Sequence, residues 1–222
     1  MAVQENASRD TPQVTSRSAK TRRQLVEAAI EILKDHGFVG ASARVIADRA
    51  GVNQGLVFYH FGSVTNLLLA ALDAVSADRM ARYGEAVAQV TSPAELVDVA
   101  SSIFREDLDA GYVSVLVAMI SGASSTQGLG AEVARRIEPW IGFAQAAMEG
   151  ALEGSPLRSA VPADDLAFGI VALYLGMELL THLDGVRAPA DALFDRAASL
   201  VGLLAGLGNV GGSGARGPEA TP

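Results

Sequence analysis

The sequence contains no cysteine, which excludes disulfide bonds, thiolate metal sites and a cysteine nucleophile. No run of eighteen apolar residues is free of a charge or a break, so we expect no membrane-spanning segment. The first twenty residues lack the apolar stretch of a secretory signal. Alternation of apolar and polar residues over a useful length is also missing, which disfavours β-strands. These absences predict an all-α, cytoplasmic protein.

Charge of the two signs is unevenly distributed along the chain. The net charge is −8, but the segment from Arg17 to Asn66 carries seven basic and four acidic side chains, a net charge of +3. From Leu67 onward there are nine basic and nineteen acidic side chains, a net charge of −10. This asymmetry is typical of a nucleic-acid-binding head on a body that does not bind nucleic acid.

The stretch from Ser42 to Phe61 has the pattern of two short helices joined by a glycine turn. Ser42 can accept a hydrogen bond from the free backbone N–H groups of the first helix, and Gly51 can end that helix in a left-handed conformation. Asn53 offers a cap for the second helix only two residues later. Three residues give the first helix an apolar side: Ile46, Ala47 and Ala50. This compactness predicts a helix-turn-helix, whose second helix enters the DNA groove.

The second helix of this pattern divides into an inward and an outward face. Val57 and Phe61 lie four residues apart, and we expect them to pack inward against the first helix. Gln54 lies near the N-terminus of the second helix, where its carboxamide can pair with an adenine edge. Gly55 lets the backbone approach the groove closely.

Three more side chains suit contacts with DNA. Tyr59 and His60 carry hydrogen-bonding tips that fit phosphate oxygens, which position a protein without reading the sequence. Arg44, in the first turn of the preceding helix, can reach a guanine edge or a phosphate.

A longer run, TRRQLVEAAIEILKDHGFVGASARVIADRAGVNQGLVFYHFGS, contains this stretch. The segment from Thr21 to Leu69 resembles the N-terminal domain of the tetracycline-repressor (TetR) family of bacterial regulators. The first-helix pattern, the IADRAGV turn and the YHF ending occur together, and together they are specific. The resemblance implies a dimeric, all-helical transcription factor whose C-terminal domain binds a small molecule. It also implies a DNA-contacting set: Ser42, Arg44, Gln54, Gly55, Phe58, Tyr59 and His60.

The sequence departs from the family pattern at two positions. A lysine that grips phosphate often begins the fourth helix of the family, and Val64 stands there in this chain. The first ring of the usual Tyr-x-His-Phe ending is Phe58, which can pack on a thymine methyl group but cannot donate a hydrogen bond. We therefore expect the grip on the DNA backbone to depend on Tyr59, His60 and the basic residues near the N-terminus.

Composition and turn residues predict four segments along the chain. These are a disordered leader (1–18), a helix-turn-helix DNA-binding domain (19–66), a helical ligand-binding and dimerisation domain (67–207) and a flexible tail (208–222). The basic end of the leader, Arg17 to Arg23, is either an arm that reaches phosphate or a solvated segment.

Helical periodicity and breaks predict the elements of an all-α fold. The first helix is expected from about Thr21 to His36, with Gly37 as its stop and an apolar face of Leu25, Ala29, Ile32 and Leu33. A helix from about Ser63 to Met80 joins the two domains. Later helices are expected at about 93–110, 113–120, 131–152, 162–182 and 189–207. The helix over 131–152 is expected to kink or restart at Pro139.

The last two helices are apolar around much of their circumference. Such a helix must bury one face in its own domain and the other elsewhere. Gly169 and Gly176 permit close approach of a partner helix. We therefore expect a homodimer held by a four-helix bundle, with a large monomeric core as the alternative.

Aromatic and methionine side chains on the later helices form the candidate ligand site. Such side chains suit an apolar or flat molecule, and the alternative is that they simply fill the core. The candidates are Phe104, Met119, Trp140, Phe143, Met148, Tyr174 and Met177. Polar candidates for orienting a ligand are Arg105, Gln145, Glu178 and His182. No histidine or carboxylate cluster of the kind that binds a metal is present in the sequence, so no metal and no cofactor is expected.

These patterns predict a ligand-responsive repressor that leaves a palindromic double-stranded DNA operator when a small apolar or aromatic effector binds. The first alternative is a helical carrier or scaffold that has lost DNA binding, as the valine at position 64 allows. The second is an enzyme that uses Glu178 and His182, one turn apart, as an acid–base pair. Because no nucleophile elbow or phosphate-binding glycine loop accompanies that pair, we expect no enzyme.

Overall fold

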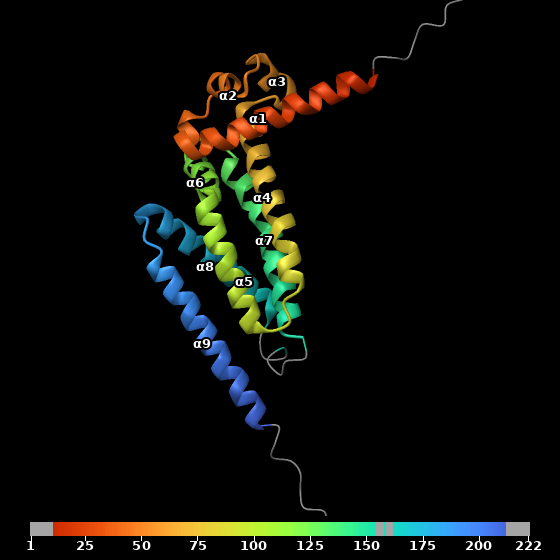
Figure 1. Cartoon of the computed structure of the whole chain (residues 1–222). Coiled ribbons are helices and arrows are strands. Elements are labelled where there is room, and N and C mark those ends of the chain that lie inside the picture. The colour runs from red at the N-terminus through yellow and green to blue at the C-terminus, as the bar shows by residue number, and fades with distance from the viewer. Residues whose placement is uncertain (1–10, 154–157, 159–161, 212–222) are drawn as a thin grey trace, which may run out of the picture. The chain divides into compact units, whose positions relative to one another are not determined.

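The computed structural model describes residues 11–153, 158 and 162–211. All regular secondary structure in this part of the chain is helical, which confirms the predicted all-α class (Figure 1). The helices are α1 (Thr11–Gly40), α2 (Ala43–Ala50), α3 (Gly55–Phe61), α4 (Val64–Ala88), α5 (Pro93–Ala110), α6 (Tyr112–Ala123), α7 (Leu129–Ala151), α8 (Ala163–Asp184) and α9 (Ala188–Gly211).

The chain forms two compact units, which we describe separately. Unit 1 comprises the described part of Met1–Asp78 together with Ser114–Val133. Unit 2 comprises Arg79–Val113 and the described part of Ala134–Pro222. The predicted division falls at Leu67, whereas the compact units divide inside α4, and most of α6 belongs to unit 1.

A close contact between α1 and α6 explains why α6 groups with unit 1. A Cβ atom placed on Gly122 would lie 2.4 Å from ring carbons of Phe38, so the phenyl ring lies directly against the glycine backbone. Only a residue without a side chain permits this approach. This contact could not be predicted, because the sequence around Gly122 does not show which aromatic ring packs against the glycine.

The first helix has the predicted apolar face and the predicted stop. Its four predicted inward residues are at most 1 % exposed: Leu25, Ala29, Ile32 and Leu33. Gly37 has a φ of 65°, which interrupts the helical backbone. Helix α2 packs against α1 in unit 1.

The start of α1 differs from the prediction. The helix begins at Thr11, so residues 11–18 are helical, whereas the sequence analysis placed them in a disordered leader. Ser16, Arg17 and Lys20 are exposed. Exposed residues such as Ser16 and Arg17 bury no apolar stripe, so the sequence gives no helical periodicity at these positions. The rest of the predicted leader, residues 1–10, lies outside the described residues.

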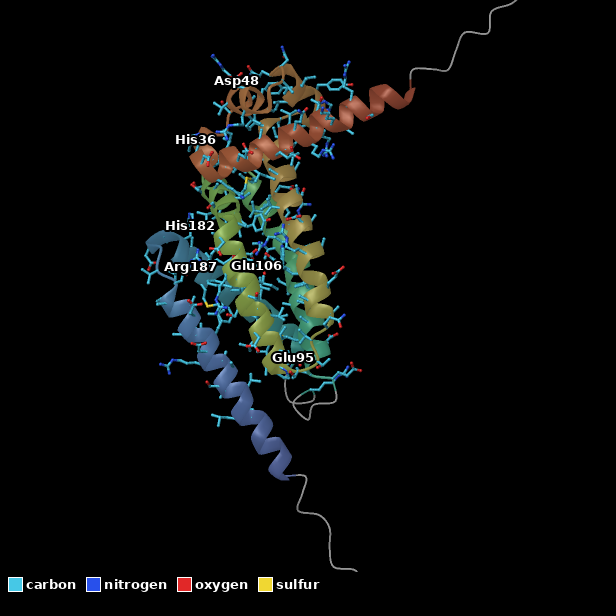
Figure 2. All side chains as sticks on the ribbon, in the orientation of Figure 1. His36, Asp48, Glu95, Glu106, His182 and Arg187 are labelled. Carbon is cyan, nitrogen blue, oxygen red and sulfur yellow. The ribbon has the colours of Figure 1, made fainter. Side chains whose placement is uncertain are left out.

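Helix α5 begins and ends as predicted. The Ser92 hydroxyl accepts a hydrogen bond from the backbone N–H of Glu95 (3.3 Å), and Gly111 ends the helix with a φ of 68°. The Glu95 carboxylate, labelled in Figure 2, accepts a hydrogen bond from the backbone N–H of Thr91 (2.8 Å), the residue before the N-cap, and so reaches back over the start of the helix much as in a capping box. That backbone bond lowers the pKa of Glu95.

Helices α8 and α9 pack against α5 in unit 2. The ring of Phe104 lies between the rings of Tyr174 and Phe194, with centroid distances of 5.6 and 5.4 Å. Arg187, labelled in Figure 2, lies in the connection between α8 and α9. Its Nη2 is 2.7 Å from Oδ1 of Asp109 in α5. An aromatic core and a surface ion pair thus fix the three helices together.

Two helices of unit 2 differ in detail from the prediction. Helix α7 continues through Pro139 as a single assigned helix, so of the two predicted outcomes the restart does not occur and the kink stays a prediction. Helix α9 continues to Gly211, beyond the predicted end at residue 207. The remaining part of the predicted tail, residues 212–222, lies outside the described residues.

Large apolar side chains of α8 and α9 are exposed. On α8 they are Leu166, Phe168, Ile170, Leu173, Leu179, Leu180 and Leu183; on α9 they are Leu193, Leu200, Leu203 and Leu204. A window of α8, Leu166–Asp184, has a mean hydropathy of 1.7 and is only 17 % buried. By length and composition alone this helix is apolar enough to cross a membrane, which the sequence analysis did not expect.

Candidate DNA interface and ligand cavity

Side-chain and glycine caps hold α2 and α3 in the predicted helix-turn-helix. The Ser42 hydroxyl accepts a hydrogen bond from the backbone N–H of Val45 (3.3 Å). Gly51 ends α2 with a φ of 67°. The N-cap position of α3 is Gln54, one residue after the predicted Asn53, but the Asn53 side-chain oxygen still accepts a hydrogen bond from the backbone N–H of Gly55 (2.8 Å), the first residue of the helix.

The inward face of the motif is buried, and an ion pair fixes α2 to α1. Val57 and Ile46 are fully buried and Phe61 is 9 % exposed, which confirms the predicted packing. Arg49 of α2 places Nη1 2.9 Å from Glu31 Oε2 of α1. The hydrogen bond to Glu31 is the main cause that raises the pKa of Arg49.

The outward face of the motif carries the predicted DNA-contacting residues. Six of the seven are exposed: Ser42, Arg44, Gln54, Gly55, Phe58 and Tyr59. The seventh, His60, is half-buried. Tyr59 is 78 % exposed, and its ring meets the ring of His60 edge to face at 5.0 Å. Arg44 lies 3.8 Å from Asp48, a loose pair that leaves most of both side chains in solvent (Figure 2). A groove or a phosphate can therefore reach these groups without any repacking of unit 1.

Unit 2 contains a cavity of about 360 Å³. Five of the seven predicted ligand-binding residues line it: Trp140, Phe143, Met148, Tyr174 and Met177. The sequence analysis missed other lining residues, among them Ile103, Ile137, Ile170, Leu173 and Phe194. Apolar residues of this kind are common on every helix, so their type alone does not distinguish a cavity wall from a core.

The other two predicted ligand-binding residues do not line the cavity. Phe104 is 1 % exposed and fills the core between α5, α8 and α9. Met119 is fully buried and belongs to unit 1, whereas the cavity belongs to unit 2. Both residues therefore have the role that the sequence analysis kept as the alternative, which is to fill the core.

A buried polar cluster lies beside the cavity, and sequence analysis missed most of it. Asp107 of α5 is fully buried and accepts four hydrogen bonds. Two come from Arg79 of α4, through Nε at 2.9 Å and through Nη2. The other two come from the hydroxyl groups of Tyr83 (2.6 Å) and Tyr174 (2.9 Å). Arg79, Tyr83 and Tyr174 all line the cavity as well.

Glu178 is the second buried carboxyl group of the cluster, and it is less well bonded. As acceptors, neither of its oxygens has a hydrogen-bond donor, and Oε1 lies 3.6 Å from Nη2 of Arg79. When Glu178 is protonated, its carboxyl group can instead donate to the neighbouring Asp107. Burial raises the pKa of Glu178 to about 8, against the opposing effect of Arg79. For Arg79, burial lowers the pKa, but the charges of Glu178 and Asp107 outweigh it and raise the pKa overall. Burial, with the hydrogen bond to Asp107 next, raises the pKa of Tyr83.

Glu178 and His182, which the sequence analysis considered as an acid–base pair under the enzyme alternative, do not form a pair. Glu178 is fully buried, while His182 is exposed near the end of α8 (Figure 2). The other polar candidates also lie outside the cavity wall, since Arg105 pairs with Asp191 (3.2 Å) and Gln145 bonds Glu149 (3.0 Å) in exposed positions. Among the described residues, no group of three or more His, Asp or Glu side chains could hold a metal ion.

Because Glu178 is buried, the stability of the protein should depend on its protonation. Glu178→Gln should make the free energy of unfolding less dependent on pH. Because the folded pKa of Glu178 lies above its ordinary value of 4.5, its proton-linked stability is present at low pH and is lost as pH rises towards about 8. Glutamine does not titrate, so the variant should lose less stability across this range. Chemical denaturation at several pH values measures the effect, with exposed Glu149→Gln as the control. A decline in Glu178→Gln as steep as in the wild type would contradict the prediction.

Known proteins resemble this chain in two respects: in the sequence of its N-terminal helices and in its overall fold. Residues 25–71 match the family model described as bacterial regulatory proteins, tetR family. The HTH-type transcriptional repressor AcnR of Corynebacterium glutamicum is 32 % identical over 95 residues, which cover 43 % of this chain and 46 % of AcnR. An uncharacterized HTH-type transcriptional regulator of Mycobacterium tuberculosis is 28 % identical over 110 residues, covering 50 % of this chain and 56 % of that protein. The matched region thus spans about half the length of these relatives.

A solved structure extends the comparison to most of the chain. The TetR-family transcriptional regulator from Cytophaga hutchinsonii superposes with a TM-score of 0.70 at 19 % identity, covering 84 % of this chain and 95 % of that one. At this identity the likeness shows a shared fold.

A capped helix-turn-helix with an exposed second helix, joined to further helices, is the arrangement with which many transcriptional regulators enter a DNA groove. Over residues 25–71 the chain matches the tetR family of bacterial regulatory proteins, so its N-terminal helices form a domain of that family's type. Over most of its length the chain shares the fold of a TetR-family regulator.

Proposed function

We propose that the protein is a repressor that binds a palindromic DNA operator as a homodimer and releases it when a small, largely apolar effector occupies the cavity of unit 2. One observation carries this proposal: the same chain has an exposed reading face on α2 and α3 and an aromatic-lined cavity of about 360 Å³. Cavities of about 300–1,000 Å³ accept drug-sized molecules. A regulator of this kind acts in the cytoplasm, where its operator lies.

The exposed apolar surface of α8 and α9 supports the dimer. Leu173, Leu180 and Leu183 recur at spacings of seven and three on α8 and are 55 %, 66 % and 71 % exposed. A Cβ atom placed on Gly169 or Gly176 would meet nothing within 4 Å, so both glycines face open space in which a partner helix can lie. Packing this surface against its own copy buries it and forms a four-helix bundle.

Release follows from a shift between two conformations of the dimer. Arg79 and Tyr83 line the cavity and lie on α4, the helix that begins at Val64 directly after the reading helix. A ligand that contacts them therefore acts on the element that leads to the DNA-binding head. A hundredfold loss of operator affinity requires that the ligand prefer the non-binding conformation by about 2.7 kcal/mol.

DNA selection over random duplexes at two salt concentrations tests the proposal. We expect enrichment of a palindromic site, and operator affinity that falls as salt increases. Failure to enrich any site at low salt would contradict DNA binding and leave the cavity as the function of the protein, as in a ligand carrier. Once a site is known, loss of DNA binding on adding apolar compounds tests the response to an effector.

Gln54→Ala should weaken operator binding by about 1–3 kcal/mol and relax specificity at one base position in each half-site, because it removes a carboxamide that can read adenine. Binding to a panel of single-base variants of the operator measures both effects. Uniform weakening over the panel would contradict base reading by Gln54.

Tyr59→Phe is the matched comparison on the same helix. It removes only the exposed hydroxyl, so binding should weaken evenly over the same panel, as expected of a phosphate contact. An effect confined to one base position would contradict the phosphate role of Tyr59.

A further inference from the structure

The wall of the cavity in unit 2 has few polar side chains. Among the described residues that line it, four carry a side-chain nitrogen or oxygen: Arg79, Tyr83, Trp140 and Tyr174. The other lining residues are aliphatic, methionine or phenylalanine. Of the four, Arg79 is the charged one, because burial raises the pKa of both phenols and keeps them neutral. The polar chemistry that a ligand can meet therefore depends on what these four groups already bind.

Asp107 engages three of these groups. The hydroxyl groups of Tyr83 (2.6 Å) and Tyr174 (2.9 Å) each donate a hydrogen bond to its carboxylate. Arg79 donates to it through Nε at 2.9 Å and through Nη2. A phenol has a single proton to donate, so a ligand cannot accept a hydrogen bond from either tyrosine unless that tyrosine leaves Asp107.

The charge of Arg79 is balanced by carboxyl groups that lie outside the cavity wall. Asp107 and Glu178 are fully buried, and neither lines the cavity. On its flat side the guanidinium carbon lies 4.6 Å from the centroid of the Trp140 ring. A ligand oxygen would therefore meet at most the remaining nitrogen, Nη1, of a group that is already paired and stacked.

An ion that enters such a cavity loses its hydration without an adequate replacement. A cation would meet the like charge of Arg79. An anion would meet a guanidinium that is already paired with Asp107 and has Glu178 3.6 Å from its Nη2. Burying an ion is strongly unfavourable unless an opposite charge and hydrogen bonds replace its water. A hydrocarbon or aromatic molecule has no such cost, and its apolar surface leaves water for the rings of Trp140 and Phe143.

Taking the proposed function as the basis, we propose that the effector is an uncharged molecule without an ionic head group, and that Asp107 sets this specificity. An arginine in an apolar cavity otherwise favours a carboxylate, which it binds through two parallel hydrogen bonds. Here Asp107 occupies that place, since Nε and Nη2 of Arg79 both donate to it. Asp107 does not line the cavity, so it is a positioning residue that acts through Arg79 and the two phenols.

Three probes of one shape test this inference: para-pentyltoluene, para-pentylbenzoate and para-pentylbenzylammonium. They differ in the group at one end of the ring, which is a methyl group, an anion or a cation. Trp140 is the only tryptophan of the chain and lines the cavity, so its fluorescence reports occupancy. At neutral pH we expect the wild type to bind the toluene at least about 100-fold more tightly than either ion.

A double variant tests the role of Asp107 as a specificity residue. Asp107→Asn together with Glu178→Gln leaves Arg79 without a counter-charge; both changes are needed because Glu178 is close enough to replace Asp107. The carboxylate of para-pentylbenzoate should then pair with the guanidinium and bind at least about tenfold more tightly than in the wild type. It should also raise the melting temperature of the double variant more than that of the wild type. The benzylammonium should gain no affinity.

Two further variants serve as controls. Asp109→Asn removes a carboxylate from the same helix, but Asp109 pairs with Arg187 in an exposed position, so all three affinities should stay unchanged. Ala144→Leu narrows the cavity wall and should weaken binding of the toluene. A general loss of stability cannot produce a gain in affinity for one probe, so the change in preference separates a specificity role from a merely structural one. The comparison of the three probes in the wild type needs no variant and holds even where the double variant does not fold.

The inference is overturned if either ion binds the wild type as tightly as the toluene, if the folded double variant gains no affinity for the benzoate, or if no probe binds. These outcomes are distinct from failure of the proposed function, which is read from operator binding. Release of the operator by the benzoate at the same concentration as by the toluene would overturn the uncharged effector alone. Tight and selective binding of the toluene without any change in operator affinity would support the specificity of the cavity and contradict the ligand-responsive repressor.

Discussion

Asp107→Ala should destabilise the protein by about 3–5 kcal/mol, a large part of the stability of an ordinary domain. The Asp107 carboxylate is fully buried and accepts every hydrogen bond that Arg79, Tyr83 and Tyr174 donate to the cluster. Removing it leaves a buried guanidinium with only Glu178 at 3.6 Å, and two phenols without these acceptors. An unpaired buried donor costs about 1–3 kcal/mol, and a buried charge costs more.

Chemical denaturation at one fixed protein concentration measures this loss, because the stability of a dimer depends on concentration. Asp109→Ala is the matched control, two residues further along α5. Asp109 pairs with Arg187 at 2.7 Å, but these side chains are 67 % and 45 % exposed, so the loss should stay within about 1 kcal/mol. Equal losses in Asp107→Ala and Asp109→Ala would show that the buried cluster does not stabilise unit 2 as described.

Leu180→Glu should abolish dimerisation and, with it, high affinity for the operator. Leu180 is 66 % exposed in the single chain, so a glutamate there does not disturb the fold of one protomer. In the proposed four-helix bundle the same position is buried on both copies, and the two-fold symmetry introduces two like charges into an apolar interface. The dissociation constant of the dimer should rise at least about 1,000-fold, equivalent to about 4 kcal/mol.

Sedimentation velocity over a range of concentrations measures the oligomeric state, and operator titration measures the effect on DNA binding. Val39→Glu is the control, because Val39 is an apolar residue of α1 that is 94 % exposed and lies outside α8 and α9. It should leave the dimer intact. A dimer that survives Leu180→Glu would place the interface elsewhere on the chain.

Local chemistry is what the sequence predicted best. Caps and stops depend on residues within one or two turns of each other, so Ser42, Gly51, Ser92 and Gly111 were identifiable from spacing alone. The inward residues of α1 followed from periodicity for the same reason. The head of the molecule, where short helices and their caps dominate, was therefore predicted in detail.

Packing between residues far apart in the chain could not be predicted from the sequence. Trp140 and Met119 are both large apolar residues on apolar helices, yet one lines a cavity in unit 2 and the other fills the core of unit 1. Arg79 and Asp107 are 28 residues apart, and on its own helix each looks like an ordinary surface charge. Their pairing depends on how α4, α5 and α8 are rotated about their axes, which no periodicity encodes.

The hydrogen bonds around Asp107 also affect the thermodynamics of ligand binding. Arg79, Tyr83 and Tyr174 are held by this carboxylate before any ligand arrives, so their rotamer freedom is already lost. A ligand that packs against them avoids an ordering cost of about 0.5–1.5 kcal/mol for each side chain, which an unbonded wall would impose. The ordering of these side chains therefore occurs during folding and does not have to occur again when the ligand binds. A variant that loosens the cluster should weaken ligand binding through the entropy of these side chains, even where every apolar contact remains.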